Sequence, residues 1–233
     1  MKMGTVIRNI PRTPQQKLDQ LRAFGTATVH EAIGRTGLMQ PYMRPIAPAL
    51  RTAGNAVTVL VHPGDNTMIH VAIEQCRPGD VLVVACSATC TDGMVGDLLV
   101  SSMIAHGVVG LILDVGCRDI VDLVEMGFPV WSRAISAKGT IKATLGQVNT
   151  PVVCAGALVN AGDVVIADDD GVVIVPFAQL DEAIAKSDQR IAKEASKRAR
   201  LKAGELGIDI ENMRPWLEQS GLVYYDTLED AQR

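Results

Sequence analysis

Runs of β-branched residues alternate with segments of helical spacing through the first half of the chain. Apolar runs at residues 56–61 and 81–85 are bounded by Pro-Gly-Asp turns, and a helical segment capped by Asn66 separates them. Residues 97–106 then carry apolar side chains at helical spacing, and residues 108–114 form another buried apolar run. This alternation predicts an α/β fold with a largely parallel or mixed sheet covered by helices.

The later part of the chain has a different pattern. Turn residues separate three short apolar runs that contain no helical spacing: residues 152–154, 164–167 and 172–175. These runs predict a second, β-rich layer or a barrel. A long polar helix with a narrow apolar stripe follows from residue 177. We therefore expect a core domain over residues 1–176 and a helical extension over residues 177–233 that contacts a neighbouring subunit.

The composition excludes several classes of protein. The chain has 233 residues, of which 48% are hydrophobic, so it can bury a sizeable core. Its formal net charge of -4 and the absence of a dense Lys/Arg block argue against a nucleic-acid surface. No apolar run approaches the ~18 residues that span a bilayer, and residues 1–8 lack the apolar segment of a secretory leader. We expect no membrane contact and a cytoplasmic location.

The cysteines also indicate a cytoplasmic location. Five of them, an odd number, are scattered through apolar segments, which is typical of reduced, mostly buried thiols rather than of a disulfide framework. Cys86 and Cys90 have the spacing of half a zinc site, but no second close Cys or His pair completes four ligands.

The most informative spacing joins Gly96-Asp97-Leu98-Leu99 to Arg118-Asp119. Ten residues of helix rise ~15 Å, and seven residues of strand return ~23 Å in the opposite direction. The chain therefore leaves Asp97 and comes back close to it. Arg118 and Asp119 emerge at the carboxyl end of a strand and beside the amino end of a helix, which is where open α/β sheets bind ligands.

Each of these residue types has a chemical role at such a position. Free N–H groups of Leu98 and Leu99, together with the helix dipole, favour a substrate carboxylate. Arg118 adds a bidentate cation for that carboxylate or for an oxyanion at the neighbouring carbonyl. Asp97 and Asp119 bring two carboxylates beside the anion, which requires a proton or a hard cation such as Mg²⁺ or Mn²⁺. Metal and arginine together would stabilise the enolate of a 2-oxo acid.

The same residues have a simpler explanation. An Arg-Asp pair after a strand often forms a helix cap with a surface salt bridge. The placement of Gly96-Asp97 one helix and one strand earlier favours the ligand site over this alternative.

These motifs resemble the 4-hydroxy-4-methyl-2-oxoglutarate / 4-carboxy-4-hydroxy-2-oxoadipate aldolase family. Its signature is matched by Asp97 and, after twenty intervening residues, by Arg118-Asp119. The likeness extends over nearly the whole chain. Further matching segments are residues 27–32, 42–46, 138–144, 167–173, 206–209 and 213–214.

The resemblance implies a class II pyruvate aldolase that depends on Mg²⁺ or Mn²⁺. It also implies an αββα sandwich and a homotrimer or homohexamer with active sites at subunit interfaces. By position, Arg118 would bind the pyruvyl carboxylate and oxo group, and Asp119 and Asp97 would organise the metal and its waters. Glu194 would join them from the adjacent subunit. The implied reaction cleaves 4-carboxy-4-hydroxy-2-oxoadipate to pyruvate and oxaloacetate, with oxaloacetate decarboxylation as a side activity.

The same fold also serves the regulator of ribonuclease E activity, a binding protein without enzymatic activity. Those relatives are shorter and lack an aspartate after the arginine. Asp119 and the long carboxyl-terminal helix therefore favour the enzyme, and a ribonuclease-binding regulator is the alternative.

Other polar residues have structural explanations. The segment Asp168-Asp169-Asp170-Gly171 lies between two apolar segments and is typical of a hairpin turn rather than a metal site. His30 is assigned a structural or interface role. Lys142 is the only candidate for a Schiff-base mechanism, because no other lysine lies on a strand-like segment. A further hypothesis is that Lys138 and Lys142 bind the distal carboxylates of the substrate.

Overall fold

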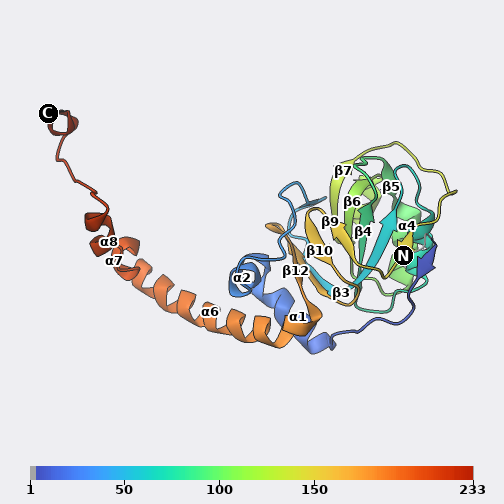
Figure 1. The fold of residues 1–233 in the computed structure, drawn as a ribbon, viewed down its shortest axis with the longest axis horizontal. Helices are drawn as coiled ribbons and strands as arrows, with labels where there is room; N and C mark the ends of the chain where they lie inside the picture. Colours follow the sequence, from blue (N-terminus) through green and yellow to red (C-terminus); the bar gives the residue numbers. More distant parts are fainter. Residues whose placement is uncertain (1–3, 233) are drawn as a thin grey trace. The chain divides into compact units, whose positions relative to one another are not determined.

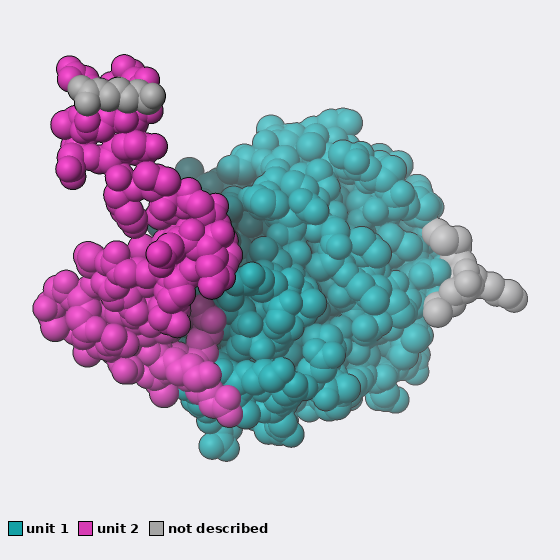
Figure 2. Space-filling model, turned by 60° about the vertical axis from the view of Figure 1, so that its left-hand side comes forward, with its two compact units in different colours: residues 1–188 teal, residues 189–233 magenta. Residues whose placement is uncertain are grey.

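A computed structural model describes residues 4–232 and contains two compact units. Unit 1 comprises residues 1–188 and unit 2 comprises residues 189–233 (Figure 2). The first turns of the long carboxyl-terminal helix belong to unit 1, because Leu180 and Ala183 are buried in its core. A separate folding domain that ends at residue 176 remains a prediction.

Within residues 4–232, a mixed sheet of ten strands forms the centre of unit 1 (Figure 1). Its strands are β1 (Thr5–Val6), β2 (Arg44–Pro45), β3 (Thr52–Val61), β4 (Asp80–Cys86), β5 (Gly93–Val95), β6 (Gly110–Cys117), β7 (Val130–Ile135), β8 (Gln147–Val148), β11 (Val164–Asp168) and β12 (Gly171–Val175). The neighbours β3, β4, β6 and β7 run parallel in that order. Their side chains are mostly buried, as expected where both faces of a parallel sheet are covered.

A second β layer folds over one face of this sheet. β11 pairs antiparallel with both β3 and β12. A separate hairpin of β9 (Val152–Cys154) and β10 (Ala157–Val159) packs beside them. Trp131 from β7, Cys154 from β9 and Ile174 from β12 share one buried cluster. The predicted second layer is therefore present, and it is continuous with the first sheet rather than a separate barrel, because β11 is hydrogen-bonded to β3.

Helices cover both outer faces (Figure 1). α3 (Thr67–Ile73), α4 (Asp97–Ala105) and α5 (Ile120–Glu125) pack on the central strands, on the face away from the second layer. α1 (Gln15–Phe24), α2 (Thr26–Ala32) and the beginning of α6 (Leu180–Lys202) pack on β11 and β12. Unit 1 is thus an αββα sandwich, which confirms the expected fold class.

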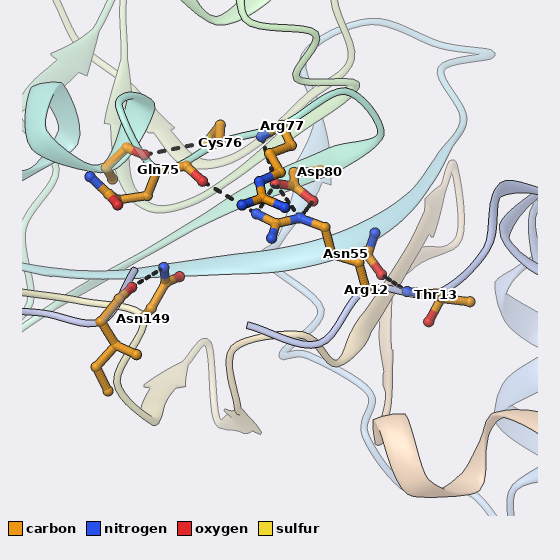
Figure 3. A network of polar contacts seen from close by, with 10 residues as sticks. Arg12, Thr13, Asn55, Gln75, Cys76, Arg77, Asp80 and Asn149 are labelled. Atoms are coloured by element: carbon orange, nitrogen blue, oxygen red, sulfur yellow. Dashed lines mark hydrogen bonds and ion pairs between the residues drawn. The ribbon is translucent and has the colours of Figure 1, made fainter. Parts of the chain in front are cut away.

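A polar network holds the segment before α1 against the sheet (Figure 3). Arg12 forms a salt bridge with the fully buried carboxylate of Asp80, with 2.8 Å between Nη2 and Oδ2. Asp80 also accepts a hydrogen bond from the N–H of Arg77 at 2.8 Å. One residue on, the N–H of Thr13 donates to Asn55 Oδ1 at 2.7 Å. A buried carboxylate is costly unless it is paired, so this network determines the position of the segment.

Unit 2 is helical. It contains the remainder of α6, followed by α7 (Gly207–Ile210), α8 (Arg214–Gln219) and α9 (Leu228–Ala231). Large apolar side chains are exposed on it, including Trp216, Tyr224 and Leu228. Exposed apolar surface is typical of a face that binds another protein. Contact of this extension with a neighbouring subunit remains a prediction.

The cysteines are free thiols, as predicted, and all but Cys86 are buried. Burial raises the pKa of the Cys76 thiol to about 12, so it is protonated and unreactive at neutral pH. Among the helices formed by residues 4–232, none combines the length and the apolar character needed to cross a bilayer.

Candidate functional site

The amino end of α4 lies directly beside the carboxyl end of β6. The short strand β5, which leads into α4, pairs parallel with the end of β6. The N–H of Arg118 donates to the carbonyl oxygen of Val95 at 2.9 Å. The two halves of the predicted motif therefore meet, because β5 extends the sheet at this point before the helix begins.

Asp119 joins the two halves through its carboxylate. Its Oδ2 lies 3.4 Å from Arg118 Nε and accepts a hydrogen bond from the N–H of Asp97 at 3.3 Å. The backbone of Asp119 is left-handed, with φ 57° and ψ 41°, which is unfavourable for a residue with a β-carbon. Gly96 is required beside it, since a β-carbon there would lie 2.0 Å from Asp119 Oδ2.

A cleft of about 180 Å³ opens at this junction, and we call it the α4 cleft. Its polar and charged lining includes Asn66, His70, Asp97, Arg118, Thr140 and Lys142, and its wall also contains Gly96, Leu98 and Leu99. The structure thus brings together five of the predicted site residues in the cleft wall. Asp119 contacts two of them from beside the cleft.

Glu194 belongs to unit 2. There its carboxylate forms a salt bridge with Arg190, at 2.8 Å from Nε. Its proposed approach to the cleft of a neighbouring subunit is not tested by the fold of one chain and remains a prediction.

The first turn of α4 presents N–H groups to the cleft. The N–H of Asp97 is bonded to Asp119, and the N–H of Val100 donates to the carbonyl of Gly96 at 3.1 Å. Among the hydrogen bonds formed by residues 4–232 outside the helix ladders, none is donated by the N–H groups of Leu98 and Leu99. These two donors and the positive end of the helix dipole favour an anion. Arg118 lines the same cleft, so the site is suited to a carboxylate.

The loop of residues 138–144 forms another part of the cleft and is held by Asp65. The buried carboxylate of Asp65 accepts hydrogen bonds from the N–H groups of Ala143 at 2.8 Å, Thr144 at 2.7 Å and Thr67 at 2.9 Å. Burial alone would raise the pKa of Asp65, but the hydrogen bonds from Thr67, Ala143 and Thr144 hold that pKa well below its usual range. An ionised carboxylate therefore fixes the backbone of the loop.

Asp65 was not predicted from the sequence, and the capping contact predicted for Asn66 is wrong. Asn66 occupies the N-cap position of α3, but its side chain makes no capping hydrogen bond. Its Nδ2 instead donates to the carbonyl of Met94 at 2.9 Å, and Asp65 accepts the N–H of Thr67. The available signal was the turn around Gly64, because an aspartate in a turn often bonds the N–H two residues later.

The two lysines of the loop have different surroundings. Lys138 Nζ forms a salt bridge with Asp92 at 3.1 Å. Lys142 lines the cleft and is exposed, so it lacks the apolar burial that a Schiff-base lysine requires. Burial is the main cause that lowers the pKa of His70, and the positive charge of Lys142 lowers this pKa further. Both effects favour the neutral imidazole.

The remaining polar candidates have structural contacts. Asp168 begins the turn between β11 and β12, which confirms the predicted hairpin, and its carboxylate accepts the N–H of Thr26 at 2.9 Å. His30 Nδ1 lies 3.1 Å from the carbonyl oxygen of Thr36, a contact consistent with a structural role. Across residues 4–232, no three or more His, Cys, Asp or Glu side chains are grouped so as to hold a metal ion.

Known proteins share both the sequence pattern and the fold. A family model described as "RraA-like: Aldolase/RraA" matches residues 26–174. A Halalkalibacterium halodurans protein named "Putative 4-hydroxy-4-methyl-2-oxoglutarate aldolase" is 27% identical over 202 residues, which cover 87% of this chain and 94% of that protein. A Burkholderia multivorans protein of the same name is 34% identical over 143 residues, covering 61% of this chain and 87% of the relative.

One solved structure extends the comparison to a different activity. Streptomyces coelicolor RraAS2, described as an unusual member of the RNase ES inhibitor RraA protein family, matches with a TM-score of 0.73 and 27% identity. The match covers 82% of this chain and 99% of that one.

Proposed function

Because the chain belongs to the RraA-like family, we propose that it is an oxo-acid lyase, a divalent-metal-dependent pyruvate aldolase. It cleaves 4-carboxy-4-hydroxy-2-oxoadipate to pyruvate and oxaloacetate, accepts 4-hydroxy-4-methyl-2-oxoglutarate, and decarboxylates oxaloacetate as a side activity. The observation that carries the proposal is that Arg118 and the free N–H groups of Leu98 and Leu99 share one cleft. The names of the two relatives support this class of reaction.

Arg118 binds the carboxylate and the 2-oxo oxygen of the substrate. Asp119, 3.4 Å from Arg118 Nε, keeps the guanidinium oriented while the remaining N–H groups of the arginine stay available to a ligand. The N–H groups at the start of α4 donate to the same carboxylate. As negative charge develops on the 2-oxo oxygen, donors that are already in place stabilise it without reorganisation.

Cleavage begins with loss of the C4 hydroxyl proton. The C3–C4 bond then breaks, its electron pair forms the enolate across C2 and C3, and C4 becomes the carbonyl carbon of oxaloacetate. A proton added at C3 gives pyruvate, so the reaction requires no oxidant or reductant. Decarboxylation of oxaloacetate produces the same enolate when the bond from C3 to the C4 carboxylate breaks, and the same donors stabilise it.

Two carboxylates at one helix end fit a hard divalent cation. Asp97 lines the cleft, and Asp119 bonds its N–H. Mg²⁺ and Mn²⁺ are often held by one or two carboxylates and several waters, which agrees with the lack of a larger acidic, His or Cys cluster in residues 4–232. When bound, the cation supplies Lewis-acid stabilisation of the enolate. Asp97, Asp119 and Glu194 of a neighbouring subunit are the residues proposed to hold it.

The proposed assembly is a homotrimer or homohexamer with the α4 cleft at a subunit interface. Leu98, at the cleft, is 79% exposed, and Val121 of α5 is 70% exposed. Large apolar side chains next to a polar site support burial by another protein surface.

Pyruvate release from 4-carboxy-4-hydroxy-2-oxoadipate, coupled to lactate dehydrogenase, tests the function. We expect activity in the purified wild type, loss of activity in EDTA, and recovery with Mg²⁺ or Mn²⁺. Arg118→Ala and Asp119→Asn should fold and lower kcat/KM by about 10²-fold or more, since each removes or misorients a donor to the developing charge. Arg22→Ala is the matched control, because Arg22 forms an exposed salt bridge on α1.

The second candidate is a ribonuclease-binding regulator. The observation in its favour is the structural similarity to the Streptomyces protein described as a member of a ribonuclease-inhibitor family. If the protein inhibits the cleavage of an RNA substrate by ribonuclease E and releases no pyruvate with either Mg²⁺ or Mn²⁺, its function is that of a regulator and not that of an aldolase.

A further inference from the structure

Lys142 is a cation in the α4 cleft that forms no ion pair within the described part of the chain. Among residues 4–232, no carboxylate lies within ion-pair distance of its Nζ, whereas Lys138 in the same loop is paired with Asp92. Arg118, the other cation of the cleft, is already assigned to the 2-oxo carboxylate and is partly balanced by Asp119. Binding of the pyruvyl half by Arg118 therefore leaves the ammonium group of Lys142 unused.

The backbone that carries Lys142 is fixed on both sides of it. Ile141 exchanges two backbone hydrogen bonds with the turn before α3: its N–H donates to Gly64 at 2.9 Å, and its carbonyl accepts from Asn66 at 3.2 Å. The next residue after the lysine, Ala143, donates its N–H to the buried carboxylate of Asp65 at 2.8 Å. A lysine held in this way presents its ammonium group to the cleft at a lower entropic cost than one on a free loop.

The same loop also borders Arg118. A β-carbon at Gly139 would lie 3.3 Å from Arg118 Nη1, so the loop and the guanidinium are in direct proximity. Two cations on one small cleft match a ligand with two carboxylates better than they match pyruvate alone.

Asn66 provides an independent indication of a ligand. It lines the cleft and is 6% exposed, and its Nδ2 is bonded to Met94. Its buried Oδ1 has no donor among residues 4–232. A buried acceptor without a donor is unfavourable, so a water or a ligand hydroxyl is expected at this wall of the cleft.

We propose that Lys142 binds the carboxylate attached to C4 of a 4-hydroxy-2-oxo acid and thereby selects diacids and triacids over 2-oxo monoacids. This inference rests on the proposed function, because it places the 2-oxo end of the ligand on Arg118. It also distinguishes the two lysines of the loop: Lys138 forms a salt bridge with Asp92, and the proposal gives Lys138 no part in ligand binding.

Binding of two unreactive ligands tests the inference. 2-Oxoglutarate carries a carboxylate on C4, 2-oxopentanoate carries a methyl group there, and neither has the C4 hydroxyl that cleavage requires. Calorimetry on the Mg²⁺-loaded wild type should show at least about tenfold tighter binding of 2-oxoglutarate, as expected for one charge-assisted contact. Lys142→Met should remove this preference and leave the affinity for 2-oxopentanoate unchanged. Lys142→Arg should restore part of it, and Lys138→Met, the matched control, should keep all of it.

The outcomes separate this inference from the proposed function. A wild type without preference for 2-oxoglutarate, or a Lys142→Met variant that keeps the preference, overturns the role of Lys142 even if the enzyme releases pyruvate. A preference that depends on Lys142 in a protein that releases no pyruvate supports the binding role and removes the aldolase. If Lys138→Met loses the preference equally, the effect is one of general surface charge and the assignment to Lys142 is wrong.

Discussion

Asp119 Oδ2 lies 3.3 Å from the backbone nitrogen of Asp97, although a helix and a strand separate the two residues along the chain. This hydrogen bond connects the first residue of α4 with the residue that follows β6 and Arg118. The same oxygen lies 3.4 Å from Arg118 Nε. A displacement of the Asp119 carboxylate therefore removes the acceptor of the Asp97 N–H and also changes the orientation of the Arg118 guanidinium. The geometry of the α4 cleft therefore depends on the space that Gly96 leaves for one side chain.

Gly96→Ala is expected to inactivate the protein without unfolding it. The new β-carbon would lie 2.0 Å from Asp119 Oδ2, which must move. That oxygen is the end of a side chain that can rotate, so the fold should survive while Arg118 loses its orientation. Misplacement of a binding group by about 1 Å can cost about 10²-fold in rate. We expect a decrease of that size in kcat/KM for pyruvate release, with a melting temperature close to that of the wild type.

Gly207→Ala is the control for this change. Within residues 4–232, no heavy atom beyond the two chain neighbours and the backbone of the same helix lies within 4 Å of a β-carbon placed at Gly207, so this substitution should leave kcat/KM unchanged. Wild-type activity in Gly96→Ala would show that the contact between Asp119 and the start of α4 is dispensable.

Asp65 should make stability depend on pH. Its hydrogen bonds hold the folded-state pKa below the usual range despite burial, so it binds fewer protons in the folded than in the unfolded state. The resulting stabilisation is present above the ordinary carboxyl pKa of about 4 and is lost as the pH falls below it. Asp65→Asn, which places an amide donor against backbone N–H groups, should destabilise the protein by about 1–3 kcal/mol at pH 7.

Urea denaturation of wild type and Asp65→Asn between pH 3 and pH 8 checks this expectation. The difference in the free energy of unfolding should shrink as the pH falls below about 4, where the wild-type carboxylate begins to lose its advantage. A difference that stays constant over the whole range would mean that Asp65 acts through shape rather than through charge.

The parts of the molecule that the sequence predicted are those determined by local pattern and chain length. The apolar runs of β4 and β6 identify buried strands, and helix and strand rise are enough to bring Asp97 near Arg118, as the hydrogen bond from the Asp97 N–H to the Asp119 carboxylate confirms. The contacts between Asp65 and the 138–144 loop join segments that no periodicity relates. They follow from the tertiary fold, as does the pairing that distinguishes Lys138 from Lys142. The junction of β11 with β3 was missed for the same reason.

Asp80 should be the most sensitive polar position of unit 1. Its carboxylate is fully buried and pairs with Arg12, which is 17% exposed. Removal of one partner from a buried ion pair leaves an uncompensated charge and typically costs about 3–5 kcal/mol. We expect Asp80→Ala to lower the free energy of unfolding by that amount in urea denaturation, and Arg12→Met combined with Asp80→Leu to recover part of the loss.

An exposed pair on α1 provides the comparison. Asp19 and Arg22 form a salt bridge in which the side chains are 49% and 54% exposed. Asp19→Ala should change the free energy of unfolding by less than about 1 kcal/mol, because solvent screens the pair. Equal losses for Asp80→Ala and Asp19→Ala would contradict the structural role assigned to the network around Asp80.

Glu194 lies in unit 2, and its proposed function in a neighbouring subunit can be tested by complementation. Arg118→Ala and Glu194→Ala should each be inactive alone, since every site in either homo-oligomer lacks one group. If the two variants are unfolded together and refolded as a mixture, random pairing should give about one quarter of the sites an intact arginine and an intact glutamate from different chains. Pyruvate release should then return to about that fraction of the wild-type value. Refolding Arg118→Ala with Asp119→Asn is the control, because both changes affect one chain's contribution to the site and no mixture can repair it. No recovery in the first mixture would place Glu194 outside the site or within the same chain's own cleft.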